Sequence, residues 1–317
     1  MKPNAAVSID VDTLSSIYKG RGCRRPDGYT FLEFRQGLET ISKFFGNYEI
    51  KTTLFMVGKD FEYAPNHAAI RAIHNQGHEI ANHSMTHPQG FRWLSAEQME
   101  EEIQNMSEAC ENVTGMKPVG FRSPGWNIGD SAIEILKRNG YIYDSSVFPT
   151  YLMPVMKFSH WASMSSQPRP NRTTMGRWRY MFAPLKPYPT SKRTLARRGA
   201  DGIIEFPVSV TPILRIPFFA TLLLFTGNEF YERLYKTIHS WKLPIHFQMH
   251  LSDFVDYSQP ELQDQMPERL QGSYVPQALT TSLEKKMEVF SRMMDRICTD
   301  YHFLTLKEWA SQMEKAS

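Results

Sequence analysis

Several features that assign proteins to familiar classes are scarce in this chain. Its 317 residues include 3 cysteines, Cys23, Cys110 and Cys298, which lie far apart and form no CxxC pair. That spacing argues against a disulfide framework and against a thiolate zinc site. The net charge of +3 is too small to indicate a partner, and no nucleic-acid-binding motif accompanies the basic residues. We therefore expect no nucleic-acid partner.

Long apolar runs are also missing. The most apolar stretch, residues 213–225, contains Arg215 and Pro217 and is too short to span a bilayer. It either packs against the rest of the protein or rests at a membrane surface. The chain starts without the long apolar region of a signal peptide. These features predict a cytoplasmic protein, with peripheral contact to the inner membrane as a further option.

Acidic residues are absent from residues 145–200, although this stretch is rich in basic ones. Its prolines argue against a long helix. We expect an extended, basic, proline-rich insertion at about 151–202, within a single domain covering 1–317. Its positive charge would suit anionic headgroups or a pyrophosphate. The basic residues are Lys157, Arg169, Arg172, Arg177, Arg179, Lys186, Lys192, Arg193, Arg197 and Arg198.

What is present is a repeated alternation of short apolar runs with amphipathic segments. This alternation predicts an α/β fold with parallel strands joined by right-handed crossovers. The expected strands are 5–9, 52–57, 79–81, 119–121, 141–143, 203–206, 245–249 and 303–305, and the expected helices are 31–45, 67–75, 95–113, 131–138, 229–241 and 282–297.

Polar residues occur where these strands end. The carboxyl ends of the strands form the rim on which (β/α) barrels assemble their chemistry from residues distant in sequence. We therefore expect a barrel with its active site at that rim. The residues at strand ends are Asp10, Asp12, His83, Arg122, Asp144 and His250.

Two histidines four residues apart, His83 and His87, are the strongest chemical signal. Together with Asp10 and Asp12 they offer three metal ligands and a spare base, and catalytic zinc sites use three protein ligands and leave one position open. The two acids could instead merely cap a strand end. His246 and His250 share one face of a strand. We expect His246, which lies deeper, to be an interior residue without a chemical role.

Four segments resemble the polysaccharide deacetylase (NodB-homology, carbohydrate esterase family four) family, whose fold is a distorted (β/α) barrel. They are TLFMVG at 53–58, GHEIANHSMTH at 77–87, FRSP at 121–124 and His250-Leu251. The resemblance is close over about 5–150 and looser over 203–306. The family usually has two adjacent acids, whereas here a residue separates Asp10 from Asp12. The spaced form resembles a subgroup with some peptidoglycan deacetylases and the deformylase of undecaprenyl-phosphate-linked aminoarabinose.

The resemblance implies a role for each motif residue. Asp12, His83 and His87 would bind a divalent metal, with zinc favoured over cobalt, nickel, manganese or iron. Asp10 would be the base, although spacing alone leaves the reverse assignment of the two acids open. The remaining implied roles are proton donation to the leaving amine by His250, pairing of Arg122 with Asp10, orientation of His250 by Asp144, and substrate binding by Pro124 and Trp126.

The resemblance implies a metal-dependent hydrolase that removes an acetyl or formyl group from the nitrogen of an amino sugar. The substrate could be lipid-linked, for example to undecaprenyl phosphate, in envelope or lipopolysaccharide synthesis. Alternatives are a deacetylase of a soluble or polymeric glycan, or a small cyclic amide hydrolase of the allantoinase type. A sugar-binding pseudoenzyme is disfavoured, because candidates for base, ligands and acid are all present.

Overall fold

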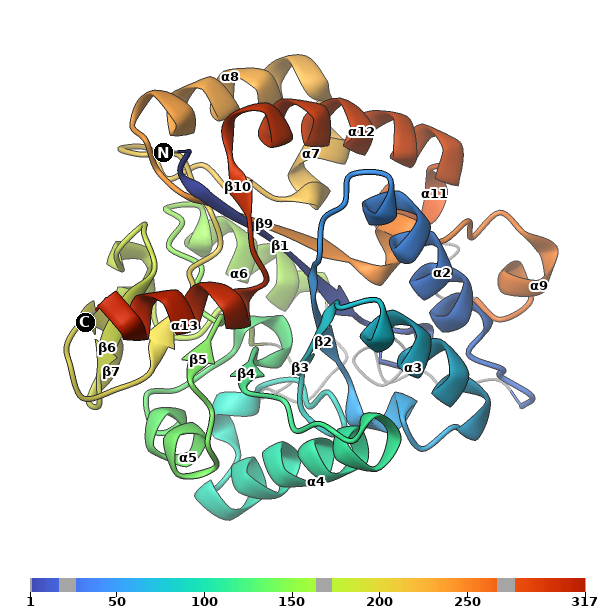
Figure 1. The fold of residues 1–317 in the computed structure, drawn as a ribbon, viewed down its shortest axis with the longest axis horizontal. Coiled ribbons are helices and arrows are strands. Elements are labelled where there is room, and N and C mark those ends of the chain that lie inside the picture. Colours follow the sequence, from blue (N-terminus) through green and yellow to red (C-terminus); the bar gives the residue numbers. More distant parts are fainter. Residues whose placement is uncertain (1, 17–26, 164–172, 267–276, 317) are drawn as a thin grey trace.

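Strands and helices alternate in the chain as the sequence predicts (Figure 1). The computed structural model describes residues 2–16, 27–163, 173–266 and 277–316. The strands are β1 Asn4–Val11, β2 Thr53–Met56, β3 Glu79–Asn82, β4 Gly120–Phe121, β5 Tyr143–Asp144, β6 Tyr188–Ser191, β7 Thr194–Arg198, β8 Ile204–Glu205, β9 Ile245–His250 and β10 His302–Phe303. The helices are α2 Leu32–Gly46, α3 His67–Asn75, α4 Ala96–Thr114, α5 Ala132–Arg138, α6 Met153–Ser163, α7 Ala220–Thr226, α8 Asn228–Ser240, α9 Pro260–Gln263, α11 Gln277–Thr280, α12 Leu283–Asp300 and α13 Leu306–Ala316.

The strands form one curled and mostly parallel sheet, in the order β10-β1-β2-β3-β4-β5-β8-β6-β7. β10 and β2 lie along one edge of β1, and β9 pairs with its other edge. The amide of Ser209 donates to the carbonyl of His246 (3.2 Å), which joins the segment after β8 to β9. The predicted α/β fold class, a distorted (β/α) barrel, is confirmed.

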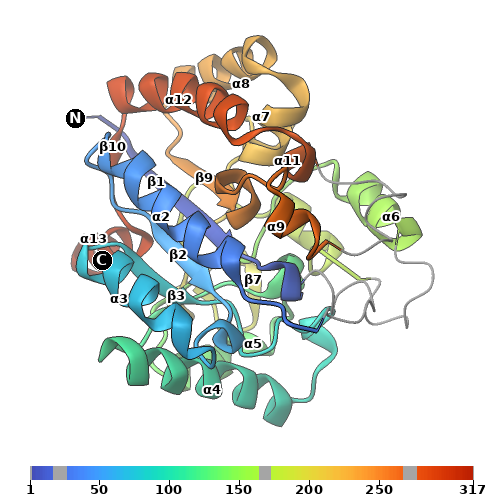
Figure 2. The same cartoon turned by 90° about the vertical axis from the view of Figure 1, so that its right-hand side faces the viewer.

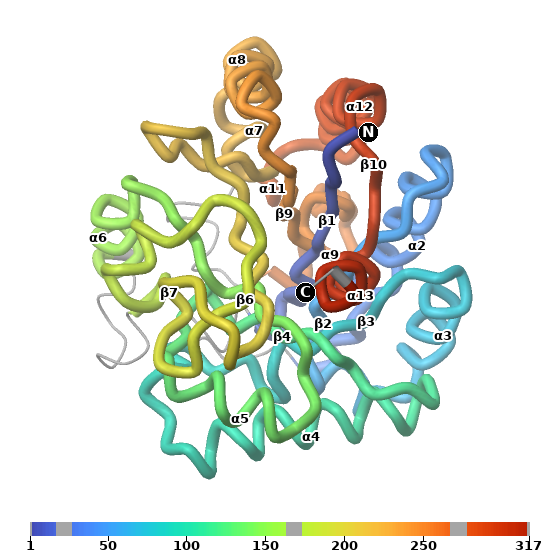
Figure 3. The backbone as a smooth tube through the Cα atoms, turned by 60° about the vertical axis from the view of Figure 1, so that its left-hand side comes forward, coloured from blue at the N-terminus to red at the C-terminus, as the bar shows by residue number. Residues whose placement is uncertain are grey.

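Alternating residues of β1 divide the molecule into an outer core and a barrel interior. Val7 and Ile9 pack outward with the helices, whereas Ala6 faces inward in a separate apolar cluster. α13 closes this interior where β2 and β3 begin: its Leu306 amide donates to Thr53, and its Trp309 joins the inner cluster (Figure 3). α13 thus covers this end of the interior, and the opposite end lies where the strands finish.

The helix that follows the His83–His87 segment has well-defined ends. The Ser95 hydroxyl accepts the Gln98 amide (3.2 Å), and the Gln98 side chain accepts the Ser95 amide (2.9 Å), so α4 begins with a capping box. Gly115 ends the helix at a φ of 76°, which glycine adopts without steric cost. Both signals were visible in the sequence.

The expectation of an extended structure at about 151–202 is wrong for residues 153–163, which form a helix. The 11-residue helix α6 projects away from the sheet (Figure 2), and Pro154 lies in its first turn, where a missing amide proton removes no helical hydrogen bond. Further on, β6 and β7 form an antiparallel pair. The basic residues Arg169 and Arg172 lie outside the described residues.

The apolar stretch 213–225 is partly buried and partly exposed. Phe218 and Leu223 are buried in the core, whereas Ile213 and Leu214 are 70% and 66% exposed. Among the described residues, no helix combines the length and the apolar character needed to cross a bilayer.

Candidate active site

Asp12, His83 and His87 meet at the carboxyl end of the barrel. Their nearest ligand atoms lie within 4.8 Å of one another, and Asp12 Oδ1 is 3.5 Å from His83 Nε2 and 3.2 Å from His87 Nε2. His87 has a φ of 51°, in the left-handed region that non-glycine residues rarely adopt. Its amide is held by the Ser84 hydroxyl (3.1 Å). The loop after β3 is thus shaped to bring the second histidine back beside the first.

These three side chains fit a divalent cation. Asp12 Oδ1, His83 Nε2 and His87 Nε2 are buried, and none makes a hydrogen bond within the described part of the chain. His83 Nδ1 donates to the Arg122 carbonyl (2.8 Å), so the lone pair of the neutral ring lies on Nε2, toward Asp12. One carboxylate with two imidazoles is a donor set typical of catalytic zinc sites.

The electrostatic field at this cluster favours an ionised acid. Burial raises the pKa of Asp12, but the neighbouring His87 and His83 outweigh it and hold that pKa well below its usual range. Burial lowers the pKa of His83, and the nearby Asp10 and Asp12 reverse this, so the net shift is upward. Asp12 is therefore held in its ionised form, which is the form that binds a cation.

Asp10 is held beside this cluster by a buried arginine. Arg122 Nη1 donates to Asp10 Oδ1 (2.5 Å), and the Gln248 side chain donates to Asp10 Oδ2 (3.1 Å). Arg122 has no solvent exposure, and its guanidinium lies 4.1 Å from the centre of the Phe55 ring. It also donates to the Ser145 carbonyl and to the hydroxyls of Ser8 and Ser145. The expected pairing of Arg122 with Asp10 is present.

His250 is the last residue of β9 and lies opposite Asp10 in the β1–β9 register. Asp253 fixes His250 through two hydrogen bonds. The His250 amide donates to the Asp253 carboxylate (2.8 Å), and the Asp253 amide donates to the His250 ring. The spacing His-x-x-Asp is that of a capping box, a signal the sequence contained and that our sequence analysis missed.

The expected contact between Asp144 and His250 is not formed. Asp144 accepts the amide (3.1 Å) and the hydroxyl (2.7 Å) of Ser146, and its neighbour across the sheet is Glu205, opposite it in the β5–β8 register. Burial, followed by the adjacent Asp144, raises the pKa of Glu205 well above its usual value. Burial also raises the pKa of Asp144, and the neighbouring Glu205 opposes this rise. Asp144 belongs to this buried acid pair.

The predicted substrate-binding residues form the edge of the site. Pro124 is buried and begins the 3₁₀ turn Pro124–Trp126. The Trp126 ring lies edge-on to the His250 ring, with 6.4 Å between their centres. Its indole Nε1 is buried and has no hydrogen-bond partner among the described residues. A buried indole donor of this kind normally has a partner, so Trp126 is arranged to receive one.

His246 lies deeper in β9, as expected for an interior residue. It contacts the Ser8 hydroxyl (2.7 Å) and the Pro207 carbonyl (3.2 Å). Burial and the nearby Arg122 lower its pKa to about 3, so the ring is neutral at physiological pH. It supports Arg122 from within the barrel.

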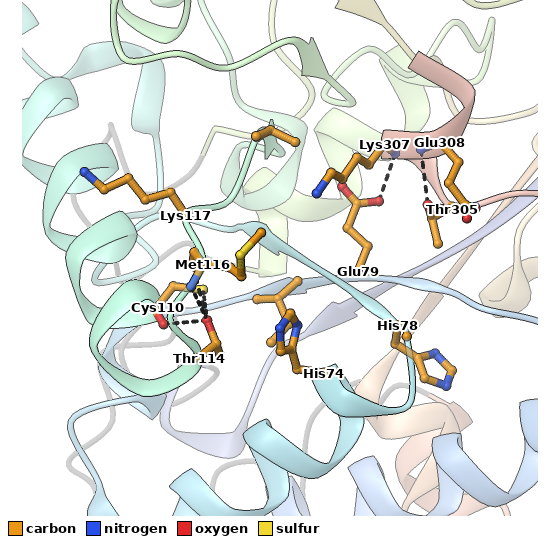
Figure 4. A pocket seen from close by; sticks show the side chains of 13 residues that line it. His74, His78, Glu79, Cys110, Thr114, Met116, Lys117, Thr305, Lys307 and Glu308 are labelled. Carbon is orange, nitrogen blue, oxygen red and sulfur yellow. Dashed lines mark hydrogen bonds between the residues drawn. The ribbon is translucent and has the colours of Figure 1, made fainter. Parts of the chain in front are cut away.

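A second pocket, of about 270 Å³, opens at the other end of the strands (Figure 4). Glu79 lies in it and accepts hydrogen bonds from Tyr143 (2.6 Å), Thr53 (2.7 Å) and the Lys307 amide at the start of α13 (2.9 Å). His78 accepts the Thr52 amide (3.1 Å). The Gly-His-Glu segment before the histidine motif therefore has a structural role, because its side chains bind β2 and the start of α13.

Comparisons with known proteins find similarity to polysaccharide and peptidoglycan deacetylases. A family model described as polysaccharide deacetylase matches residues 27–143. A peptidoglycan deacetylase-like protein of Gibberella zeae is 29% identical over 51% of this chain and 53% of its own length. A peptidoglycan deacetylase of Helicobacter pylori is 26% identical over 47% of this chain and 51% of its own length. The chain thus spans about half the length of these curated relatives.

One solved structure is similar over the whole fold. It is a Mycobacterium smegmatis protein assigned to the polysaccharide deacetylases, with a TM-score of 0.62 and 16% identity over 100% of this chain and 92% of that one. At this identity the likeness concerns the fold alone.

Proposed function

The chain belongs to the polysaccharide deacetylase family, and we propose that it is a metal-dependent hydrolase that removes an N-acyl group from an amino sugar. The observation that carries the proposal is the cluster of Asp12, His83 and His87, whose unpartnered ligand atoms lie beside Asp10 and its buried arginine. A divalent cation held by the three would polarise the amide carbonyl and activate water.

Asp10 is the base in this proposal. Arg122 and Gln248 each occupy one lone pair of its carboxylate, which fixes its orientation and leaves further lone pairs to accept the proton of a water molecule. Arg122 also compensates the buried negative charge. Asp12 faces the two histidines instead, so the geometry favours Asp10 over Asp12 for this role.

His250 is the acid. An amide nitrogen leaves poorly as an anion, so it has to be protonated as the carbon–nitrogen bond breaks. The Asp253 amide donates to the His250 ring, and the Gln248 side-chain nitrogen lies 3.2 Å from His250 Nε2, so the ring is held close to Asp10. Trp126, beside His250, offers its indole N–H to the substrate.

The test pairs metal analysis with release of acetate or formate from N-acylated saccharides. Asp10→Asn should bind metal as the wild type does but lose activity by about 10²–10⁴-fold. Asp12→Ala should lose both properties. Asp264→Asn, at an exposed position, is the matched control and should retain both. If the metal-loaded wild type released no acyl group from neutral, polymeric or lipid-linked saccharides, the proposal would be wrong. Ring opening of allantoin, without acyl release from any saccharide, would favour the cyclic amide alternative.

We further propose that the enzyme works at an anionic membrane surface, where a lipid-linked saccharide would reach it. Support comes from the α6 surface, an exposed apolar area formed by Tyr151, Leu152, Val155, Phe158, Trp161, Phe182, Ile213 and Leu214. The Tyr151 and Phe182 rings are 5.8 Å apart, and Arg215 donates to the carbonyls of Met181 and Ala183, so the two chain segments are joined. The surrounding stretch 145–200 contains no acid.

Vesicle flotation tests this second proposal. The wild type should float with vesicles containing about a third anionic lipid, because apolar side chains and cations act together at such surfaces, and less with neutral ones. Phe158→Ser with Leu214→Ser should abolish flotation. Trp241→Ser, which removes an exposed aromatic ring from another part of the molecule, is the control. Equal flotation of the Phe158→Ser, Leu214→Ser double variant and of the Trp241→Ser control would contradict the proposal.

A further inference from the structure

A groove of about 540 Å³ lies beside the active site and is lined by basic and aromatic side chains, here called the cationic groove. Its walls include Arg92, Trp93, Arg177, Trp178 and Arg179. Trp93 and Trp178 are more than half exposed. Lys157 contributes a further positive charge, because its ammonium lies 4.7 Å from the centre of the Trp178 ring.

Positive charge in the groove exceeds negative charge. Asp130 is the acid that contacts these cations: it pairs with Arg177 (3.3 Å) and with Arg179. Arg92 and Lys157 both donate to the Gly176 carbonyl, and neither has an ion-pair partner among the described residues. Arg92 Nε is buried without a hydrogen-bond partner in the same part of the chain. Burial and the neighbouring Arg92 lower the pKa of Lys157 to about 8, as expected for a cation that faces other cations.

The cationic groove is attached to the catalytic rim. The Arg92 amide donates to the Asn127 carbonyl (3.0 Å), and the Met175 amide donates to the Gly125 carbonyl (2.9 Å). Both acceptors flank Trp126, whose ring contacts His250. A saccharide whose acylated sugar lies at His250 would therefore have its neighbouring residue near the groove.

We propose that the cationic groove binds an anionic group, a carboxylate or a phosphate, on the sugar next to the one that is deacylated. The inference rests on the proposed function and names its substrate class as acidic saccharides. Guanidinium groups bind carboxylate and phosphate oxygens through paired hydrogen bonds. The flat faces of Trp93 and Trp178 provide apolar surface for a sugar ring.

Direct binding to the inactive Asp10→Asn variant tests the groove separately from catalysis. The probes are a neutral N-acetylglucosamine tetramer, a tetramer of equal length carrying lactyl carboxylates, and a tetramer of equal length carrying phosphate monoesters. Calorimetry should show that at least one anionic probe binds about tenfold or more tightly than the neutral one at low salt. High salt should reduce this difference. Equal affinity for all three, or no binding, would overturn the proposal.

The single substitutions Arg177→Gln and Arg179→Gln, each made in the Asp10→Asn background, should remove most of the preference for anionic over neutral saccharides. Each of these variants leaves Asp130 one guanidinium partner. Arg233→Gln, at an exposed position on α8, is the charge-matched control. If Arg177→Gln weakened vesicle flotation while the preference for anionic saccharides was unchanged, the groove would serve lipid headgroups and the proposal would be wrong. Binding by Asp10→Asn without any acyl release by the wild type would instead refute the proposed function alone.

Discussion

At the scale of single residues, Arg122 connects more of the site than any motif histidine does. It joins Asp10 of β1, Ser145 after β5 and His83, which donates to its carbonyl. All of these groups are buried. A buried charge pair is stable only while both partners remain, so the arginine and the acid act as a unit.

We expect Arg122→Met to lower the free energy of unfolding by about 3–5 kcal/mol, because it strands the buried Asp10 carboxylate. The double variant Asp10→Asn, Arg122→Met should be more stable than Arg122→Met alone, since the stranded charge is gone. Urea unfolding measures both. The exposed pair partner Arg138 supplies the control: Arg138→Met should unfold close to the wild-type midpoint. Strictly additive losses in the double variant would contradict this account.

The raised pKa of Glu205 predicts how the free energy of unfolding depends on pH. Its pKa is raised from an ordinary value of 4.5 by burial and by Asp144, so between the two values the folded state binds a proton that the unfolded state releases. The free energy of unfolding that this bound proton contributes is fully present below about pH 4.5. It is lost as the pH rises through the folded-state pKa of Glu205. Glu205→Gln cannot ionise, so it should be more stable than the wild type at pH 8 and similar at pH 5.

Urea midpoints at a series of pH values between 5 and 8 measure this difference. Glu229→Gln, at an exposed position on α8, is the control and should follow the wild-type curve. Parallel curves for the wild type and Glu205→Gln would show that the acid pair does not hold the proton.

At the scale of elements, the helix after the histidine loop depends on its cap. Ser95→Ala removes the hydroxyl that accepts the Gln98 amide and should cost about 1 kcal/mol of unfolding free energy in thermal or urea unfolding. Ser131→Ala is a suitable control, because Ser131 precedes α5 without capping it through its side chain. An equal effect of the two substitutions would exclude the capping explanation.

The strand ends were predictable because parallel strands buried on both faces read as short apolar runs followed by polar residues. The position of Asp10, His83 and His87 at or just after strand ends could therefore be predicted from the sequence. The acid pair of Asp144 and Glu205 was not, since it depends on the pairing of β5 with β8, and no local pattern reports a register between distant strands. α6 was missed because Pro154 was counted as a helix breaker, although it lies in the first turn.

At the scale of the whole molecule, a bound cation would connect the end of β1 to the loop after β3 and stabilise the folded state alone. We expect added zinc to raise the midpoint of thermal unfolding in a concentration-dependent way, by about 2.7 kcal/mol of stability at a hundredfold excess over the dissociation constant. A chelator should reverse the shift. His87→Ala should lose the response, whereas His302→Ala, at an exposed position, should keep it. An unchanged midpoint in the wild type would argue against the site.

The position of β1 has a consequence for the order in which the protein can fold. One edge of this strand is completed by β9, and the start of its other edge by β10, so Asn4 lies opposite His302 and Asp10 opposite His250. A nascent chain that has emerged only as far as β5 contains all three proposed ligands but still exposes an apolar strand edge, a state prone to aggregation. Closure of long loops is also slow. The candidate site can thus assemble fully only after β9 has left the ribosome, and β1 must remain unpaired on that edge until then.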